Sequence, residues 1–104
     1  MKLMYNVTIS IDPAVEKQWT SWMIDNHIPD VMSTGKFLNY SMQKVLAGNP
    51  KEGITYAIQY VAASREIYEK YQQEDAPKLQ AEHDKKFRGY YGAFRTLMEI
   101  VSHS

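Results

Sequence analysis

The chain begins with a segment in which apolar and polar side chains alternate. Between residues 3 and 11 the odd positions are all apolar or aromatic, whereas the even positions include Asn6, Thr8 and Ser10. Because successive side chains of a strand point to opposite faces, this period of two predicts a half-buried β-strand. The same alternation predicts three further strands, at residues 36–46, 54–61 and 91–102. Turn formers at residues 48–53 predict that the second and third strands form a hairpin with a long loop.

An amphipathic helix is predicted to follow the first strand. Asp12 supplies an N-cap oxygen, and Pro13 stands at the first helical position, where its missing N–H is not needed. Apolar side chains then recur at steps of three and four and form one stripe, which His27 extends. Because a further proline follows His27, we expect this helix to end near Asn26 and a turn to cover residues 28–34.

Two helical pieces are predicted between the third and fourth strands. Ser64 is a suitable N-cap for the first piece, and Pro77 favours a break near residues 74–75. In the second piece the buried side recurs every four residues, at Leu79, His83 and Phe87.

The order of these elements matches the ferredoxin-like β-α-β-β-α-β unit. We therefore predict an α+β fold in which residues 1–104 form one domain, with a four-stranded antiparallel sheet and helices on one face. The other face of the sheet needs a cover, and in many small proteins of this class a second copy supplies it. A homodimer of the dimeric α/β-barrel type is accordingly expected.

Composition narrows the classes of partner and compartment. Twelve basic residues balance twelve acidic residues, so no overall field attracts nucleic acid or an anionic membrane. No apolar run approaches the roughly 20 residues of a membrane span, and the first residues do not resemble a signal peptide. The absence of cysteine excludes thiolate chemistry and is compatible with a reducing compartment. We expect a cytoplasmic protein without a nucleic-acid or membrane partner.

Two histidines are the candidates for acid/base chemistry. His27 ends a helix, where its imidazole is available for proton transfer or, alternatively, caps the helix C-terminus. His83 is either a ligand contact or a buried histidine with one satisfied hydrogen bond. Convergence of the two would favour a metal or an acid/base pair, but neither spacing matches a metal motif. We expect no metal and no cofactor.

Small polar side chains gather on the sheet face opposite the predicted helices. In the ferredoxin-like order the first and third strands are neighbours, which brings Asn6 and Thr8 beside Gln59. We expect Arg95 of the last strand to join them and to bind a carboxylate or phosphate by bidentate hydrogen bonds. This face is the predicted ligand pocket. Alternatively, Arg95 and Glu99 form a salt bridge across the dimer or contact only water.

Several segments together resemble a known family. They are Tyr5-Asn6-Val7-Thr8, Trp19 with Trp22-Met23, His27-Ile28-Pro29, Thr34-Gly35-Lys36-Phe37, Thr55-Tyr56-Ala57-Ile58-Gln59-Tyr60, Ala76-Pro77-Lys78-Leu79-Gln80-Ala81-Glu82-His83 and Phe94-Arg95-Thr96. In this order they resemble DUF4286, a bacterial domain of unknown function, over nearly the whole chain. The resemblance implies a ferredoxin-like fold and supports dimerisation, and it supplies no activity. A looser similarity links the segment from Trp19 to His27, with Gly35-Lys36-Phe37, to monooxygenases and isomerases of the dimeric-barrel class.

Two functions follow from these features. The first is a homodimeric binding or interaction module for a small molecule. The alternative is a small cofactor-independent enzyme, monooxygenase-like or isomerase-like, that uses His27 as acid/base and holds its substrate on the polar sheet face. The small number of candidate catalytic groups favours the binding or interaction module, because the sequence offers two isolated histidines and no activated nucleophile.

Overall fold

A computed structural model describes residues 1–47 and 53–104. Its four strands are β1 (Leu3–Ile11), β2 (Asn39–Lys44), β3 (Ile54–Ala62) and β4 (Tyr91–Glu99). They form one antiparallel sheet in the order β2-β3-β1-β4. The predicted ferredoxin-like α+β fold is thereby confirmed. Most of the predicted hairpin turn, residues 48–52, lies outside the described residues.

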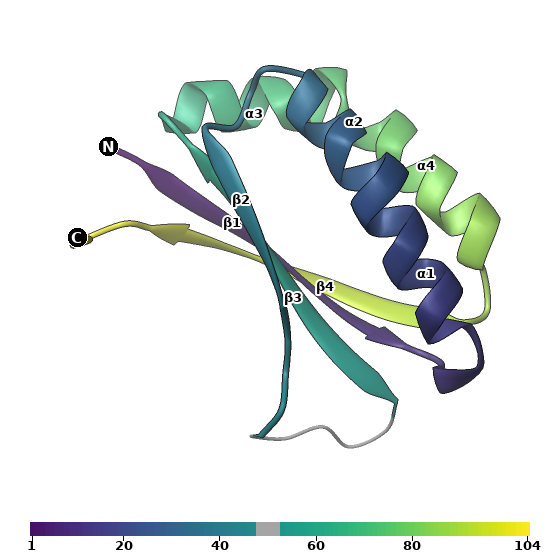
Figure 1. Ribbon diagram of the computed structural model, residues 1–104. Helices are drawn as coiled ribbons and strands as arrows, with labels where there is room; N and C mark the ends of the chain where they lie inside the picture. The colour runs from purple at the N-terminus through teal and green to yellow at the C-terminus, as the bar shows by residue number, and fades with distance from the viewer. Residues whose placement is uncertain (48–52) are drawn as a thin grey trace.

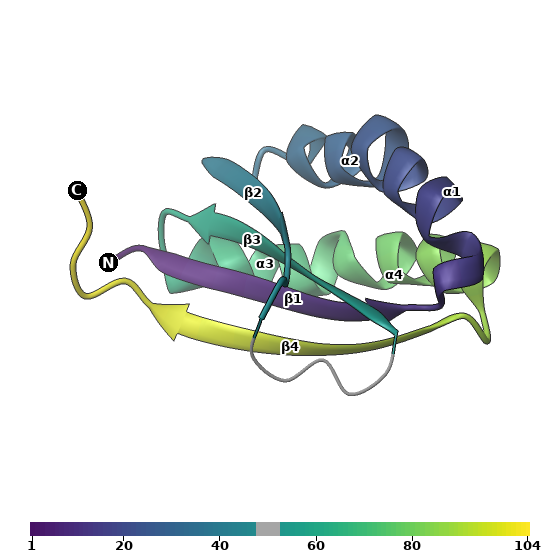
Figure 2. The same cartoon turned by 60° about the horizontal axis from the view of Figure 1, so that its bottom comes forward.

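All helices lie on one side of the sheet (Figures 1 and 2). After a short 3-10 turn, η1 (Pro13–Val15), the first helical segment consists of α1 (Glu16–Trp22), η2 (Met23–His27) and α2 (Ile28–Ser33). The second consists of α3 (Arg65–Glu74) and α4 (Ala76–Phe87). None of the helices in the described part of the chain combines the length and apolar character needed to span a bilayer.

The sheet presents its two faces as the alternation predicts for β1. Tyr5, Ile9 and Ile11 are buried under the helices, whereas Asn6 lies opposite Gln59 of β3 on the face without helices, which we call the open face. Alternate residues of β1 and β3 thus separate an apolar layer from a polar one. The prediction that Asn6, Thr8 and Gln59 share the open face is confirmed.

The predicted end of the first helix near Asn26 is wrong. The chain passes through a π-turn, η2, in which the N–H of Ile28 bonds to the carbonyl of Met23, and then continues as α2. In a regular helix at about 100° per residue, Ile28 would point about 180° away from Trp19. The wider turn brings Ile28 and Val31 back to the buried side. Pro29 is accommodated in the first turn of α2, where its missing N–H is tolerated.

The break between the last two helices is confirmed. The Ser64 hydroxyl accepts a hydrogen bond from the N–H of Ile67 at 3.2 Å and caps α3. α3 ends at Glu74, and α4 begins at Ala76, with Pro77 in its first turn. Leu79, His83 and Phe87 form the buried side of α4 as expected.

Two strands are shorter than the alternation predicts. Gly35 adopts a positive φ of 74° and turns the chain, after which Phe37 leaves the plane of the sheet and stacks against Tyr5 in the core. β2 therefore begins at Asn39 instead of residue 36. β4 ends at Glu99 because its partner β1 begins at Leu3, and the Ile100 N–H bonds to Lys2 as the last contact of the pair.

Candidate functional site

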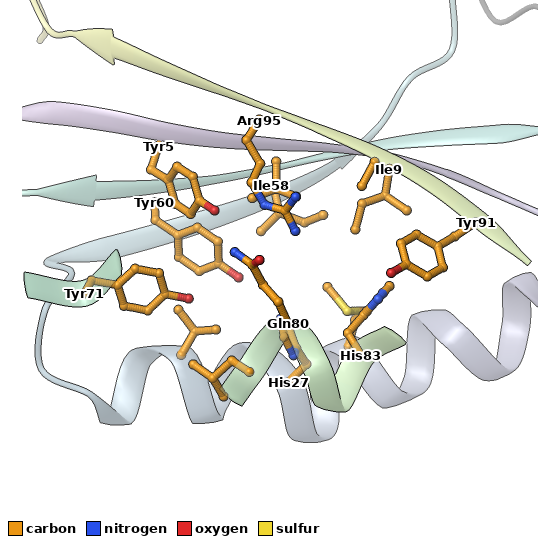
Figure 3. A pocket seen from close by; sticks show the side chains of 15 residues that line it. Tyr5, Ile9, His27, Ile58, Tyr60, Tyr71, Gln80, His83, Tyr91 and Arg95 are labelled. Carbon is orange, nitrogen blue, oxygen red and sulfur yellow. The ribbon is translucent and has the colours of Figure 1, made fainter. Parts of the chain in front are cut away.

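A cavity of about 40 Å³ lies between the helices and the sheet. Its floor is formed by side chains of β1, β3 and β4, and its walls by η2, α2, α3 and α4 (Figure 3). We call this cavity the pocket. The lining side chains are Tyr5, Val7, Ile9, Met23, His27, Val31, Ile58, Tyr60, Tyr71, Leu79, Gln80, His83, Tyr91, Ala93 and Arg95.

Three buried tyrosines present their hydroxyl groups to the pocket. The rings of Tyr5, Tyr60 and Tyr71 pack together in the core, with Tyr5 6.2 Å from Tyr60 and 6.1 Å from Tyr71 between ring centroids. Within the described chain, every side-chain polar atom without accessible surface has a hydrogen-bond partner, yet these three hydroxyls have none. They must therefore open onto the pocket, as Figure 3 shows. Burial raises the pKa of Tyr60 and Tyr71, so both remain hydrogen-bond donors.

The indole of Trp19 determines which ring nitrogen of His83 carries the proton. Its Nε1–H donates to Nε2 of His83 at 2.9 Å, and both residues are buried. Because an indole N–H only donates, Nε2 must be unprotonated and the neutral ring carries its proton on Nδ1. Burial, aided by the charges of His27 and Arg95, lowers the pKa of His83 to about 4. The expectation of a buried histidine with one satisfied hydrogen bond is confirmed, and the same residue also lines the pocket.

His27 reaches the pocket from the π-turn. Its imidazole lies 5.7 Å from that of His83 and 5.2 Å from the indole of Trp22 between ring centroids. Burial lowers the pKa of His27 to about 4; the Asp30 carboxylate opposes this shift, and the Arg95 charge adds to it. No hydrogen bond joins the ring to another described residue, so its nitrogens have accessible surface, and the residue lines the pocket. The structure thus brings together two neutral imidazoles that the sequence could not place.

Arg95 lies on the face opposite to the one predicted. Its partner across the β1–β4 ladder is Val7, which faces the helices, so Arg95 points under them and lines the pocket. Figure 3 shows its guanidinium extending toward the amide of Gln80 and the hydroxyl of Tyr5. Glu99 shares this face, because it pairs with Leu3. The side chain of Arg95 is exposed, since β4 is an edge strand and the helices do not fully cover it.

The candidate residues therefore divide into two sets. His27, His83 and Arg95 line the pocket, whereas Asn6 and Thr8 lie on the open face with Gln59. The Asn6 amide donates to the Thr8 hydroxyl at 2.9 Å, so these groups already satisfy each other. The expectation that Arg95 joins the polar open-face residues is corrected by the register of β4.

Sequence reasoning missed the tyrosines as functional candidates. Tyr5 and Tyr60 occur on the apolar side of their strands, where the alternation predicts core residues. A signal was nevertheless present, because a tyrosine on a buried face brings a polar tip that needs a partner. Tyr91 differs, since its hydroxyl already donates to Asp84 at 2.9 Å and only its ring contributes to the pocket.

The pocket does not have the composition of a metal centre. In residues 1–47 and 53–104, no group of three or more His, Cys, Asp or Glu side chains is placed to hold an ion. In addition, a metal on Nδ1 of His83 would have to displace the proton that the Trp19 bond keeps there. The geometry instead offers hydrogen-bond donors, one cation and two unprotonated imidazoles.

Fold and pocket together define a ferredoxin-like α+β protein with a cavity between sheet and helices. The chain belongs to the DUF4286 family, a domain of unknown function, whose model matches residues 2–101. A comparison with curated proteins gave no match.

Solved structures with the same fold come from several organisms. At3g17210 from Arabidopsis thaliana has a TM-score of 0.72 at 13% identity, covering 98% of each chain. A mutant of SnoaB, a cofactor-independent oxygenase from Streptomyces nogalater, has a TM-score of 0.68 at 11% identity over 98% of this chain and 95% of its own. A dimeric ferredoxin-like protein from an uncultured marine organism has a TM-score of 0.66 at 13% identity, covering 99% and 98%. At these identities the similarity shows the fold alone.

The two neutral histidines predict a loss of stability in acid. The pKa of His83 rises from about 4 in the fold to its ordinary 6.5 on unfolding, so the unfolded chain binds more protons between these values. The fold therefore keeps its full stability above pH 6.5, and the conflict between burial and protonation of His83 lowers the free energy of unfolding by about 3 kcal/mol as the pH falls to about 4. Urea denaturation across this range measures the effect.

The matched variants are His83→Gln and His103→Gln, the latter in the exposed C-terminal tail. His83→Gln should be less stable at neutral pH but should lose less stability in acid than the unmodified protein. His103→Gln should keep the full dependence. An equal pH slope in all three proteins would contradict the assignment of a buried, neutral His83.

Proposed function

We propose that the protein is a homodimeric, cytoplasmic small-molecule-binding protein whose ligand occupies the pocket. The observation that carries this proposal is the set of three tyrosines, Tyr5, Tyr60 and Tyr71, whose rings are buried and whose accessible hydroxyls open onto the pocket. Three hydroxyls that converge on one cavity offer a bound molecule several hydrogen-bonding groups at once. The cysteine-free composition is what supports the cytoplasmic location.

The walls of the pocket have the composition of a binding site. Aromatic and aliphatic side chains make up most of the lining, with a few polar groups directed to its centre, notably Gln80 and Arg95 (Figure 3). This combination is typical of small-molecule sites, where apolar walls provide contact and a few polar groups provide orientation. The site is held on helices and strands, so its geometry is preorganised.

Binding in the pocket is tested by blocking its mouth. Ala93 is exposed on β4 and lines the pocket, so Ala93→Phe should fill the entrance without disturbing the core. The compounds to test, each separately by thermal shift and NMR, are formate, acetate, benzoate, acetamide, benzamide and phenol. We expect some of them to bind the unmodified protein and to fail to bind Ala93→Phe. The control is Ala81→Phe, because Ala81 is exposed on α4 away from the pocket.

Two results would contradict a ligand-binding pocket. One is that none of the carboxylates (formate, acetate and benzoate) and none of the neutral compounds (acetamide, benzamide and phenol) perturbs the NMR signals of the pocket residues. The other is that Ala93→Phe and Ala81→Phe bind the same compounds with the same affinity.

The open face supports a homodimer. Phe94 and Met98 of β4 lie on this face, opposite Thr8 and Met4 of β1, and are 62% and 38% exposed. Large exposed apolar side chains on an uncovered sheet face are typical of a surface that packs against another layer. A dimeric protein among the structures of the same fold agrees with this arrangement. We propose that the open faces of two copies pack together.

Dimerisation is tested by placing a charge on the open face. Phe94→Glu should shift the mass measured by light scattering from twice 12.1 kDa toward 12.1 kDa over a dilution series. Such a change opposes burial, because an unpaired carboxylate is costly to desolvate. The control is Ile24→Glu, since Ile24 is 55% exposed but belongs to η2 in the helical layer. A mass of 12.1 kDa for the unmodified protein at high concentration would rule out the dimer.

A second candidate function is that of a small cofactor-independent enzyme in which His27 is the base. The observation that favours it is the neutral imidazole of His27, which opens onto the pocket and has no hydrogen bond within the described chain. Such an imidazole can accept a proton from an acidic C–H or O–H of a bound molecule. The negative charge left behind would then face Arg95. A cofactor-independent oxygenase occurs among the proteins of the same fold.

Proton abstraction is tested with deuterium exchange. In D₂O, acetoacetate and pyruvate should exchange the hydrogens next to their ketone carbonyl faster in the presence of the protein than without it. His27→Gln should remove this acceleration by a factor of about 10²–10⁴, because general-base catalysis contributes that much. His103→Gln serves as the control. Equal exchange with and without protein for both compounds would eliminate His27 as a base toward these ketones.

A further inference from the structure

The pocket has an unbalanced charge. Arg95 is its one cation, and the residues that line it in the described chain include no aspartate or glutamate. The five ion pairs of the described residues all involve other lysines and arginines. No acidic group of these residues lies within salt-bridge distance of the Arg95 guanidinium. The Arg95 side chain is exposed and needs no counter-charge, but its guanidinium lines the pocket and is therefore available to an anionic group of a bound molecule.

The hydrogen-bonding groups of the pocket are mainly donors. Besides Arg95, the protonated hydroxyls of Tyr60 and Tyr71 and the amide of Gln80 can donate. The Trp19 bond adds another donor, because it holds Nε2 of His83 as an acceptor and so leaves the proton on Nδ1. Nδ1 has no partner within the described chain and must have accessible surface. A ligand group facing His83 must therefore be an acceptor.

The size of the cavity limits the group that it holds. At roughly 10–15 Å³ for each water-sized group, a cavity of about 40 Å³ holds about three such groups. A carboxylate consists of three heavy atoms. Larger parts of a ligand would have to extend through the mouth beside Ala93 and Arg95, which are both exposed.

We propose that the pocket binds the carboxylate group of a small organic acid, with one oxygen held by the Arg95 guanidinium and another by the Nδ1–H of His83. Trp19 is a positioning residue in this arrangement, since it touches His83 and sets which ring nitrogen donates. This inference rests on the proposed function of ligand binding in the pocket and specifies the chemical class of the ligand.

The first test reads the histidine directly. Nitrogen NMR of the unmodified protein at neutral pH should show His83 as the Nδ1–H tautomer, and addition of acetate should shift its signal. Trp19→Phe removes the indole donor and should give a mixture of the two tautomers. An Nε2–H tautomer in the unmodified protein would overturn the proposal, and this measurement does not depend on whether Trp19→Phe folds.

The second test compares matched pairs of compounds. Acetate should bind at least about tenfold more tightly than acetamide, and benzoate more tightly than benzamide, because charge-assisted bonds to arginine are about twice as strong as neutral ones. Arg95→Gln should abolish this preference. Arg65→Gln should retain it, because Arg65 is an exposed arginine of α3 that pairs with Glu69 outside the pocket.

The outcomes separate this inference from the proposed function. If the amides perturb the pocket as strongly as the carboxylates, the carboxylate assignment fails while ligand binding stands. If neither carboxylates nor amides perturb it, and phenol does not either, both proposals fail. A preference that survives in Arg95→Gln would also overturn the assignment, since the carboxylate would then be held elsewhere.

Discussion

The hydrogen bond between Trp19 and His83 joins the two helical segments that lie side by side on the sheet. Trp19 belongs to α1 and His83 to α4, and both side chains are buried, so their polar atoms depend on each other. Around this bond, Trp22 contacts His83 and Phe87, and Tyr56 contacts Trp19. The pocket lies directly beside this hydrogen bond. Because His83 lines the pocket, the position of that part of the wall depends on the bond to Trp19.

The π-turn explains how the other wall is built. A regular helix would direct Ile28 away from the sheet, whereas the turn places Ile28 and Val31 in the core and leaves His27 at the cavity. Turns of this kind often mark functional positions in helices, because an inserted residue changes which side chain faces a site.

Features that depend on neighbouring residues could be predicted from the sequence. The Ser64 cap, the helix break at Asp75 and the two-sided pattern of β1 follow from local chemistry, and the structure confirms them. The face of Arg95 could not be predicted in this way. On β4 both sides carry apolar residues, Phe94 and Met98 on one and Leu97 on the other, so alternation alone is ambiguous. Only the register with β1, which pairs Arg95 with Val7, settles its side.

The same distinction applies to the pocket. The spacing of Tyr5 and Tyr60 predicts that both lie on buried faces of their strands. The direction of their hydroxyls, however, depends on the packing between β1, β3 and the helices. The convergence of His27 and His83 likewise joins residues 56 positions apart, which no local pattern encodes.

One strand therefore serves two surfaces. β4 directs Arg95 into the pocket and, from the next position on each side, Phe94 and Thr96 toward the open face. A shift of β4 by a single residue would exchange these surfaces, because it would turn Arg95 to the open face and an adjacent side chain toward the pocket. Association through the open face would hold β4 in register, and a molecule bound to Arg95 would do so from the opposite side. The cavity and the open face thus depend on one register of β4 with β1, and neither surface can be altered by a slip of this strand without altering the other.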